Sequence, residues 1–228
     1  MGCQVAVARH GRLAGMATFG STADGAPATD DTLFACFSST KATMAVAMWQ
    51  LLEEGKWALD DPVTKFVPEF GTLGKERVRM RHLVTFTGGF PNPPTDLTDI
   101  ELMGSSAART EQFATWPLEF EPGSKWVYHG GSAHWVMAEV VERITGLDFR
   151  DVLRSRVLDP SGLTGFFVGM PEEVQPQYEL AGLIAANPAT DRQRAMIEEA
   201  KSDPSKRPMG GGVAPALGMP GGGGYCTA

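Results

Sequence analysis

The 228-residue sequence contains no long apolar run and no cluster of basic residues, and these absences exclude two classes of protein. No segment approaches the ~18 consecutive apolar residues that a membrane-spanning helix needs. The apolar run at residues 4–8 is too short for the core of a signal peptide. A formal net charge of −7 without a basic patch argues against a nucleic-acid-binding surface. We therefore predict a cytoplasmic protein that binds neither membranes nor nucleic acids.

Cysteine and histidine are also scarce. Three cysteines, Cys3, Cys36 and Cys226, do not make a disulfide framework, so we expect reduced thiols. We interpret Cys36 as a small, buried apolar residue. The four histidines lie in no pattern with cysteine or aspartate that is typical of a metal site. The sequence therefore predicts neither a metal nor a cofactor.

A Ser-x-x-Lys pattern, Ser38 to Lys41, precedes a segment with few polar residues, and residues 40–53 are predicted to form a buried helix. Residues three apart share a helix face, so the two side chains can touch. Burial and the helix dipole both favour the neutral amine of Lys41, which is the form that a general base requires. Such a base would activate the Ser38 hydroxyl as a nucleophile. The alternative is that Ser38 is an ordinary N-cap, because the pattern also occurs by chance.

A second candidate element surrounds Tyr128. Pro122 and Gly123 predict a turn, and a short apolar run then leads to Tyr128. Residues 132–145 follow with apolar side chains at helical spacing, and Gly146 is a typical residue to end that helix. Tyr128 is therefore expected in a loop between ordered segments, where side chains often reach a cleft. An ordinary buried tyrosine with a backbone partner is the alternative.

Together these elements resemble the serine β-lactamase-like hydrolases, which include class C β-lactamases, D-alanyl-D-alanine carboxypeptidases and family VIII-type carboxylesterases. The resemblance covers residues 1–170, and a weaker likeness recurs at residues 221–228. It implies that Ser38 is the nucleophile and Lys41 its partner base. It also implies that Tyr128 begins the Tyr-x-Asn element, which relays protons to and from the leaving group.

The sequence departs from that family in two places. Gly130 stands where the family has asparagine, and this makes β-lactam hydrolysis less favoured than ester hydrolysis. The third family motif, Lys-Thr-Gly or His-x-Gly on a strand, is not found after Tyr128, so one oxyanion donor is expected to be missing. Trp126, His129 and Gly130 are the candidate substrate contacts. The alternatives are core packing for Trp126 and an ordinary surface position for His129.

The predicted fold class is α+β, with the antiparallel sheet and helical region of a β-lactamase/transpeptidase-like domain. We expect a single domain, shortened at the C-terminus, whose C-terminal strands are missing. An isolated two-stranded sheet is marginally stable, so three accounts of its open edge are left. The chain is a shortened form of a longer ancestor, which we favour, or a homo-oligomer covers the edge, or the rest of the structure has adapted. The single domain is predicted to span residues 1–228. Residues 1–37 are the lead-in, which contains a β-hairpin with strands at 4–8 and 13–19. Residues 38–200 hold the nucleophile helix and the helical region, and residues 201–228 form a Gly/Pro-rich tail.

The predicted function is that of a carboxylesterase, which cleaves small acyl esters through an acyl-enzyme on Ser38, with Lys41 and Tyr128 as general base and acid. A β-lactamase or D-amino-acid peptidase that acts on amides is the first alternative. A non-catalytic, penicillin-binding-like fragment is the second, because the third motif is absent. The sequence leaves the natural substrate and its acyl length open.

Overall fold

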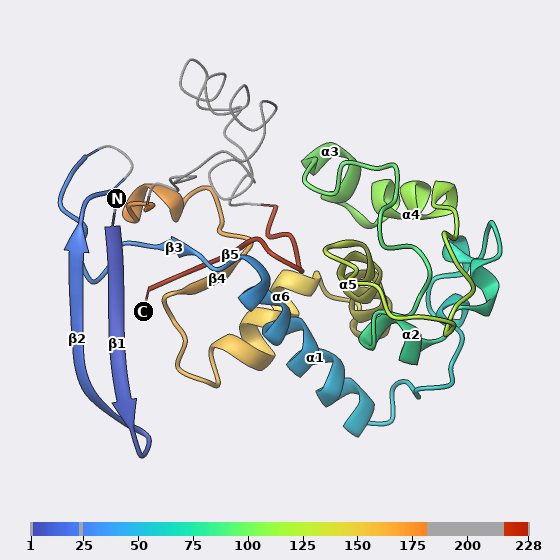
Figure 1. Cartoon of the computed structure of the whole chain (residues 1–228), viewed down its shortest axis with the longest axis horizontal. Helices are drawn as coiled ribbons and strands as arrows, with labels where there is room; N and C mark the ends of the chain where they lie inside the picture. The colour runs from blue at the N-terminus through green and yellow to red at the C-terminus, as the bar shows by residue number, and fades with distance from the viewer. Residues whose placement is uncertain (1, 23–24, 182–216, 228) are drawn as a thin grey trace.

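The computed structural model describes residues 2–22, 25–181 and 217–227. Over these residues the chain combines two small antiparallel sheets with a group of helices (Figure 1). The β-hairpin lies at one end of the molecule, the three-stranded sheet near the middle and α2 to α5 toward the other end. The α+β class predicted from the sequence is confirmed.

The N-terminal hairpin pairs β1 (Gly2–Arg9) with β2 (Arg12–Gly20), close to the predicted strands. His10 and Gly11 form the tight turn between them, and both have positive φ, 52° and 71°. Most of its side chains are exposed, among them Val7 at 56% and Phe19 at 60%. The hairpin therefore contributes little to the hydrophobic core.

A second sheet contains β3 (Phe34–Ala35), β4 (Phe166–Val168) and β5 (Gly224–Cys226) in the order β3-β5-β4, with both pairs antiparallel. Its central strand, β5, lies in the segment that the sequence analysis interpreted as a Gly/Pro-rich tail. β5 pairs with β3 and β4 and not with the hairpin, so it is not one of the C-terminal strands that were expected to be missing from the hairpin's sheet. Residues 182–216, which include the first part of that predicted tail, lie outside the described residues.

The helices surround a core centred on α5, of which residues 132–141 are all buried. Both the start and the end of α5 agree with the prediction, and Gly146 has the expected left-handed conformation. The α-helices are α1 (Lys41–Glu53), α2 (Met80–Val84), α3 (Ile100–Met103), α4 (Ser106–Thr115), α5 (Ser132–Thr145) and α6 (Phe149–Leu153). A π-helical turn follows at Arg154–Leu158, and 3₁₀ turns occur at η1 (Phe37–Thr40), Val63–Lys65, Pro68–Phe70, Lys75–Arg77 and Gln175–Gln177.

Only one face of α1 is buried, although its sequence predicted burial on all sides. Met44, Met48 and Leu51 pack into the core, whereas Trp49 is 66% exposed and Val46 is 38% exposed. The buried face packs against α5, α6 and the π-helical turn. This packing fixes the start of α1 at Lys41, and with it the preceding 3₁₀ turn that carries Ser38, relative to α5.

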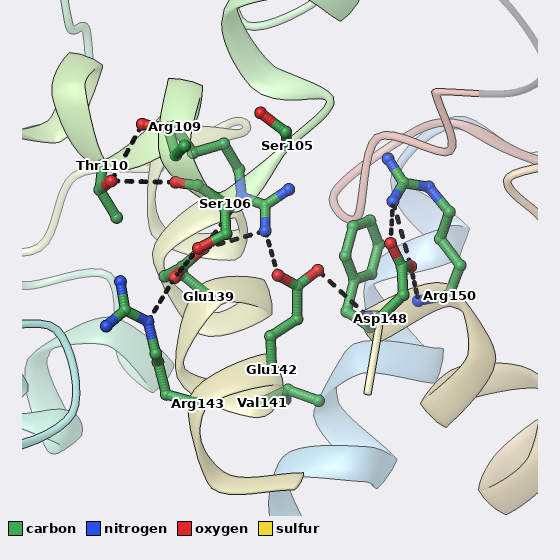
Figure 2. A network of polar contacts seen from close by, with 12 residues as sticks. Ser105, Ser106, Arg109, Thr110, Glu139, Val141, Glu142, Arg143, Asp148 and Arg150 are labelled. Carbon is green, nitrogen blue, oxygen red and sulfur yellow. Dashed lines mark hydrogen bonds and ion pairs between the residues drawn. The ribbon is translucent and has the colours of Figure 1, made fainter. Parts of the chain in front are cut away.

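A buried ionic network joins α4 to α5 (Figure 2). Glu139 is fully buried and accepts hydrogen bonds from Ser106 at 2.6 Å, from Arg109 at 2.9 Å and from Arg143 at 2.8 Å. Arg109 also contacts Glu142. Burial raises the pKa of Glu142, and the neighbouring Arg109 partly offsets that rise. Since a buried charge without a partner is costly, the network favours one relative position of the two helices.

Within the described ranges, no helix combines the length and the apolar character that crossing a membrane requires.

Candidate functional site

The backbone that carries Ser38 is a short 3₁₀ turn between β3 and α1. The amide of Cys36 donates to the carbonyl of Gly224 at 2.8 Å, which anchors the start of the turn on β5. Phe37 then has a φ of 45°, an uncommon value for a bulky residue and one that stores strain where it occurs. Strained backbone of this kind often accompanies functional residues, and here it directly precedes Ser38.

Ser38 is not the N-cap that the alternative interpretation proposed. The N-cap of α1 is Thr40, which makes no side-chain cap bond. The Ser38 hydroxyl oxygen instead lies 2.8 Å from the Tyr128 hydroxyl and 3.2 Å from Lys41 Nζ. A 3₁₀ turn brings residues three apart into line, which explains the Ser38–Lys41 contact.

Lys41 is held by two backbone carbonyls from distant parts of the chain. Its Nζ donates to Gly130 O at 2.8 Å and to Gly221 O. Nζ also donates to Ser38 Oγ at 3.2 Å, so three oxygens surround the amine. These contacts hold Nζ beside the Ser38 hydroxyl.

Tyr128 completes a triangle of polar side chains with Ser38 and Lys41. Its ring packs edge-to-face on Phe86, with 5.4 Å between the ring centroids, and the backbone amide of Val127 donates to Phe86 O at 3.1 Å. Lys41 Nζ lies 5.2 Å from the Tyr128 ring centroid. Burial raises the pKa of the Tyr128 phenol, but hydrogen bonds from Ser38 and Lys41 and the Lys41 charge outweigh it and lower that pKa overall. The side chain is 45% exposed, so its hydroxyl is accessible from solvent.

The glycine turn before β5 is a part of this site that the sequence analysis missed. A Cβ atom on Gly221 would lie 3.1 Å from Gly130 O and 3.2 Å from the Cβ of His134, so the backbone of the turn packs closely against both. Further along, the amide of Gly224 donates to the buried Thr40 hydroxyl at 3.0 Å. The glycines from 221 onward were the available signal, because a run of glycines also marks a place where the backbone approaches closely.

His129 was predicted to contact substrate, but its ring is buried and both ring nitrogens contact backbone groups. Its Nε2 accepts from the amide of Phe90 at 3.2 Å, and its Nδ1 lies 2.7 Å from Val127 O. These partners assign the proton to Nδ1. Burial lowers the pKa of His129 and so favours this neutral form. The structure therefore gives His129 a role in holding the loop, with no ring nitrogen left for a substrate.

The other two predicted substrate contacts differ in position. The Gly130 carbonyl binds Lys41, so Gly130 helps to form the site through its backbone. Trp126 is 65% exposed and lies two residues before Tyr128 in the same loop. Its contact with substrate stays a prediction.

His134, in the first turn of α5, was not singled out from the sequence. Its ring is 4% exposed, and Nδ1 has no hydrogen-bond partner among the described residues. Burial, and then the charge of Lys41, lower the pKa of His134 to about 3. The imidazole is therefore neutral beside Lys41, and its ring lies 5.7 Å from that of Phe86. A single histidine within an apolar helix face does not, from sequence alone, indicate that the residue lies beside the site.

Comparisons with known proteins agree with this geometry. The family model described as Beta-lactamase matches residues 1–228. Esterase EstB of Burkholderia gladioli is 34% identical in an alignment 203 residues long, which covers 78% of this chain and 50% of that protein. A β-lactamase of Yersinia enterocolitica is 31% identical over 156 residues, 68% of this chain and 38% of that protein. The chain thus spans about half the length, or less, of these curated relatives.

A solved structure is similar over the whole chain. The penicillin-binding protein homolog from Caulobacter crescentus superposes with a TM-score of 0.77 at 26% sequence identity, covering 100% of this chain and 62% of that one. Likeness of this extent shows a shared fold.

Proposed function

Because the chain belongs to the β-lactamase family, we propose that it is a serine hydrolase that cleaves small acyl esters through an acyl-enzyme on Ser38. One observation carries the proposal: the Ser38 hydroxyl lies within hydrogen-bond distance of both Tyr128 and Lys41. A serine hydroxyl needs such a neighbouring base before it becomes an effective nucleophile. The proposal also covers the hydrolase activity of the protein as a whole.

In the acylation step, Ser38 Oγ attacks the ester carbonyl while its proton passes to Lys41 Nζ. The carbonyls of Gly130 and Gly221 hold Nζ at 3.2 Å from the Ser38 hydroxyl, and this step requires the neutral form of the amine. The tetrahedral adduct then collapses, the bond to the alcohol breaks, and the alcohol oxygen takes a proton. Tyr128 is the donor best placed for that transfer, since its hydroxyl lies 2.8 Å from Ser38 Oγ and is open to solvent.

Deacylation reverses these roles. A water molecule attacks the acyl carbonyl, and its proton moves to Tyr128 or Lys41. The Ser38 oxygen leaves and recovers a proton from the same groups. A phenol with a lowered pKa exchanges protons more readily near neutral pH, so the environment of Tyr128 suits both steps.

The negative charge that develops on the carbonyl oxygen in the tetrahedral adduct also needs a hydrogen-bond donor. The backbone amide of Ser38, at the start of the turn that leads into α1, is the proposed oxyanion donor. Removing one oxyanion donor typically costs 10²–10³-fold in rate, so loss of this amide would slow the reaction without changing its type.

Esters are favoured over amides because Gly130 lacks the amide side chain of the family's Tyr-x-Asn element. The similarity to an esterase at 34% identity supports the same choice. The similarity to a β-lactamase supports the alternative function, which is the hydrolysis of amides. Parallel assays with p-nitrophenyl esters and nitrocefin distinguish the two, and a preference for nitrocefin would overturn the ester assignment.

A non-catalytic fragment is the remaining alternative. A fluorophosphonate probe should label the folded protein on Ser38, and the Ser38→Ala variant should not be labelled. Folded wild-type protein that resists the probe would favour the non-catalytic alternative.

We also propose that a second copy covers the exposed apolar hairpin. Val5, Val7, Leu13 and Phe19 are each at least 45% exposed, and an open hairpin edge favours association. Light scattering should show an oligomer whose mass falls when Val7 and Phe19 are both replaced by threonine. A monomeric wild type would contradict it.

A further inference from the structure

The thiols of Cys36 and Cys226 lie in contact although 190 positions separate them, with 3.0 Å between the sulfur atoms. Cys36 was predicted to be a buried apolar residue, yet it is only half-buried and its neighbour is a second thiol. The third cysteine, Cys3, is exposed. We propose that Cys36 and Cys226 form a dithiol site that small-molecule disulfides oxidise to a reversible cross-link between β5 and the segment carrying Ser38.

The register of the sheet places the two thiols together. Phe34 pairs with Cys226 across β3 and β5, and side chains of paired residues share a face. Cys36 is two residues further on, so its side chain returns to that face as a diagonal neighbour of Cys226. Its amide donates to Gly224 O at 2.8 Å, which keeps the strands in register there. A disulfide needs about 2.05 Å between the sulfurs, so they must approach by about 1 Å.

The environment makes Cys226 the reactive member of the pair. The Cys36 thiol donates to the Cys226 sulfur, and this bond stabilises the Cys226 thiolate. It lowers the pKa of Cys226 to about 7, while the same contact and burial raise the pKa of Cys36. The thiolate is the nucleophile in disulfide exchange. A surface cavity of about 310 Å³ lies beside Cys226, and a reagent can approach that residue there. The cavity is lined by Gly2, Cys3, Gln4, Phe34, Cys226 and Thr227, so Cys3 faces the same reagent and must be tested as a competing thiol.

The chemistry balances with an organic disulfide as oxidant. The Cys226 thiolate attacks one sulfur of the reagent, its S–S bond breaks, and one reagent thiolate leaves and takes up a proton. Cys36 then loses its proton and attacks the Cys226 sulfur of the mixed disulfide, which expels the second reagent thiolate. Two protein thiols become one disulfide, and one reagent disulfide becomes two thiols.

The cross-link would act on the candidate site because β5 is connected to it. Gly224 donates to Thr40, and Gly221 accepts from Lys41. A bond between Cys36 and Cys226 would fix β5 against the turn that carries Ser38, and with it the Gly221 carbonyl. Because it joins residues so far apart in sequence, it would also constrain the unfolded chain strongly.

The test uses the full chain, reduced and then treated with oxidised glutathione, followed by alkylation and mass spectrometry. Wild-type protein should lose two of its three free thiols, and a peptide pair joined through Cys36 and Cys226 should appear. Dithiothreitol should reverse both changes. The melting temperature should be several degrees higher in the oxidised form.

Three variants sharpen the test. Cys3→Ser, the matched control, should still form the cross-link. Cys36→Ser should stop at a glutathione adduct on Cys226, and Cys226→Ser should leave Cys36 largely unmodified. A wild-type protein that keeps both thiols, carries only glutathione adducts, or links Cys3 instead would overturn the proposal. The number of free thiols and the cross-linked peptides are both measured on the cysteines, so they do not depend on hydrolase activity.

Discussion

The hydroxyl oxygens of Ser38 and Tyr128 lie 2.8 Å apart although 90 positions separate the two residues in sequence. Ser38 is fixed by the turn between β3 and α1, and Tyr128 by the packing of its ring on Phe86. Their meeting at Lys41 is therefore a property of the fold, and it makes three polar side chains available to one substrate.

Replacing Tyr128 by phenylalanine should remove the proton relay while keeping the ring on Phe86. We expect kcat for p-nitrophenyl butyrate to fall by about 10²–10³-fold with little change in KM, because general acid–base groups contribute to this extent. The melting temperature serves as the control and should change little, since the hydroxyl is exposed. A kcat within threefold of wild type would remove Tyr128 from the mechanism.

Gly221→Ala should disturb Lys41 through its carbonyl acceptor. The new Cβ would lie 3.1 Å from Gly130 O and close to His134, so the turn must move. We expect kcat to fall by about tenfold or more, because small displacements of a positioned group are costly. Gly222→Ala is the matched control, since its Cβ would meet the flexible end of Met219. Equal activity of the two variants would contradict a role for Gly221.

Gly130→Asn should shift preference toward β-lactams. A Cβ at residue 130 would have the Tyr128 ring at 3.9 Å as its nearest neighbour, so the side chain can be accommodated. The asparagine would restore the amide that the family places there. We expect the ratio of nitrocefin to p-nitrophenyl ester turnover to rise relative to both wild type and Gly130→Ala. An unchanged ratio would show that this position does not set the preference.

Acid should destabilise the protein through His129 and His134. Both have a pKa in the folded state below the ordinary value of 6.5, and that of His134 is about 3. The unfolded chain therefore takes up protons first, so stability is present above pH 6.5 and declines as the pH falls below it. Each group contributes up to about 1.4 kcal/mol per pH unit. For His134 the decline continues toward pH 3.

Urea unfolding at pH 7 and pH 5 measures this effect. His134→Leu should lose less stability between the two pH values than wild type does, because it removes one titrating group. His10→Leu, an exposed turn residue, is the control and should keep the wild-type difference. Identical differences in wild type and His134→Leu would contradict the assignment.

Arg109→Met should lower stability sharply, because it leaves Glu139 and Glu142 buried without their shared cation (Figure 2). Removing one partner of a buried ion pair costs about 3–5 kcal/mol. Arg143→Met removes a partly exposed arginine from the same network and should cost about 1 kcal/mol or less. Chemical denaturation of both variants gives the comparison, and similar losses would show that burial of Arg109 is not decisive.

Local features of this chain were predictable from sequence because neighbouring residues determine them. The periodic valines of α5 and Gly146 marked that helix, and alternating residues around His10 and Gly11 marked the hairpin. The spacing of Ser38 and Lys41 was also local. The family resemblance then supplied Tyr128 as their partner.

Long-range contacts were not predictable in the same way. The carbonyl of Gly221 reaches Lys41 across 180 positions, and Cys226 reaches Cys36 across 190. Glycine-rich sequence near residue 221 favours a flexible loop by composition alone, yet pairing with β3 and β4 orders Gly224–Cys226 as a strand. His129 seemed available to substrate because it lies in a loop, but two backbone groups bind its ring inside the protein.

The central claim is that Ser38 carries an acyl group during turnover. Rapid quenching of the protein with p-nitrophenyl acetate, followed by peptide mass spectrometry, tests it directly. We predict an acetyl group on the peptide containing Ser38, with no such modification in Ser38→Ala. Ester turnover that persists in Ser38→Ala, or acylation found on another residue, would contradict the account.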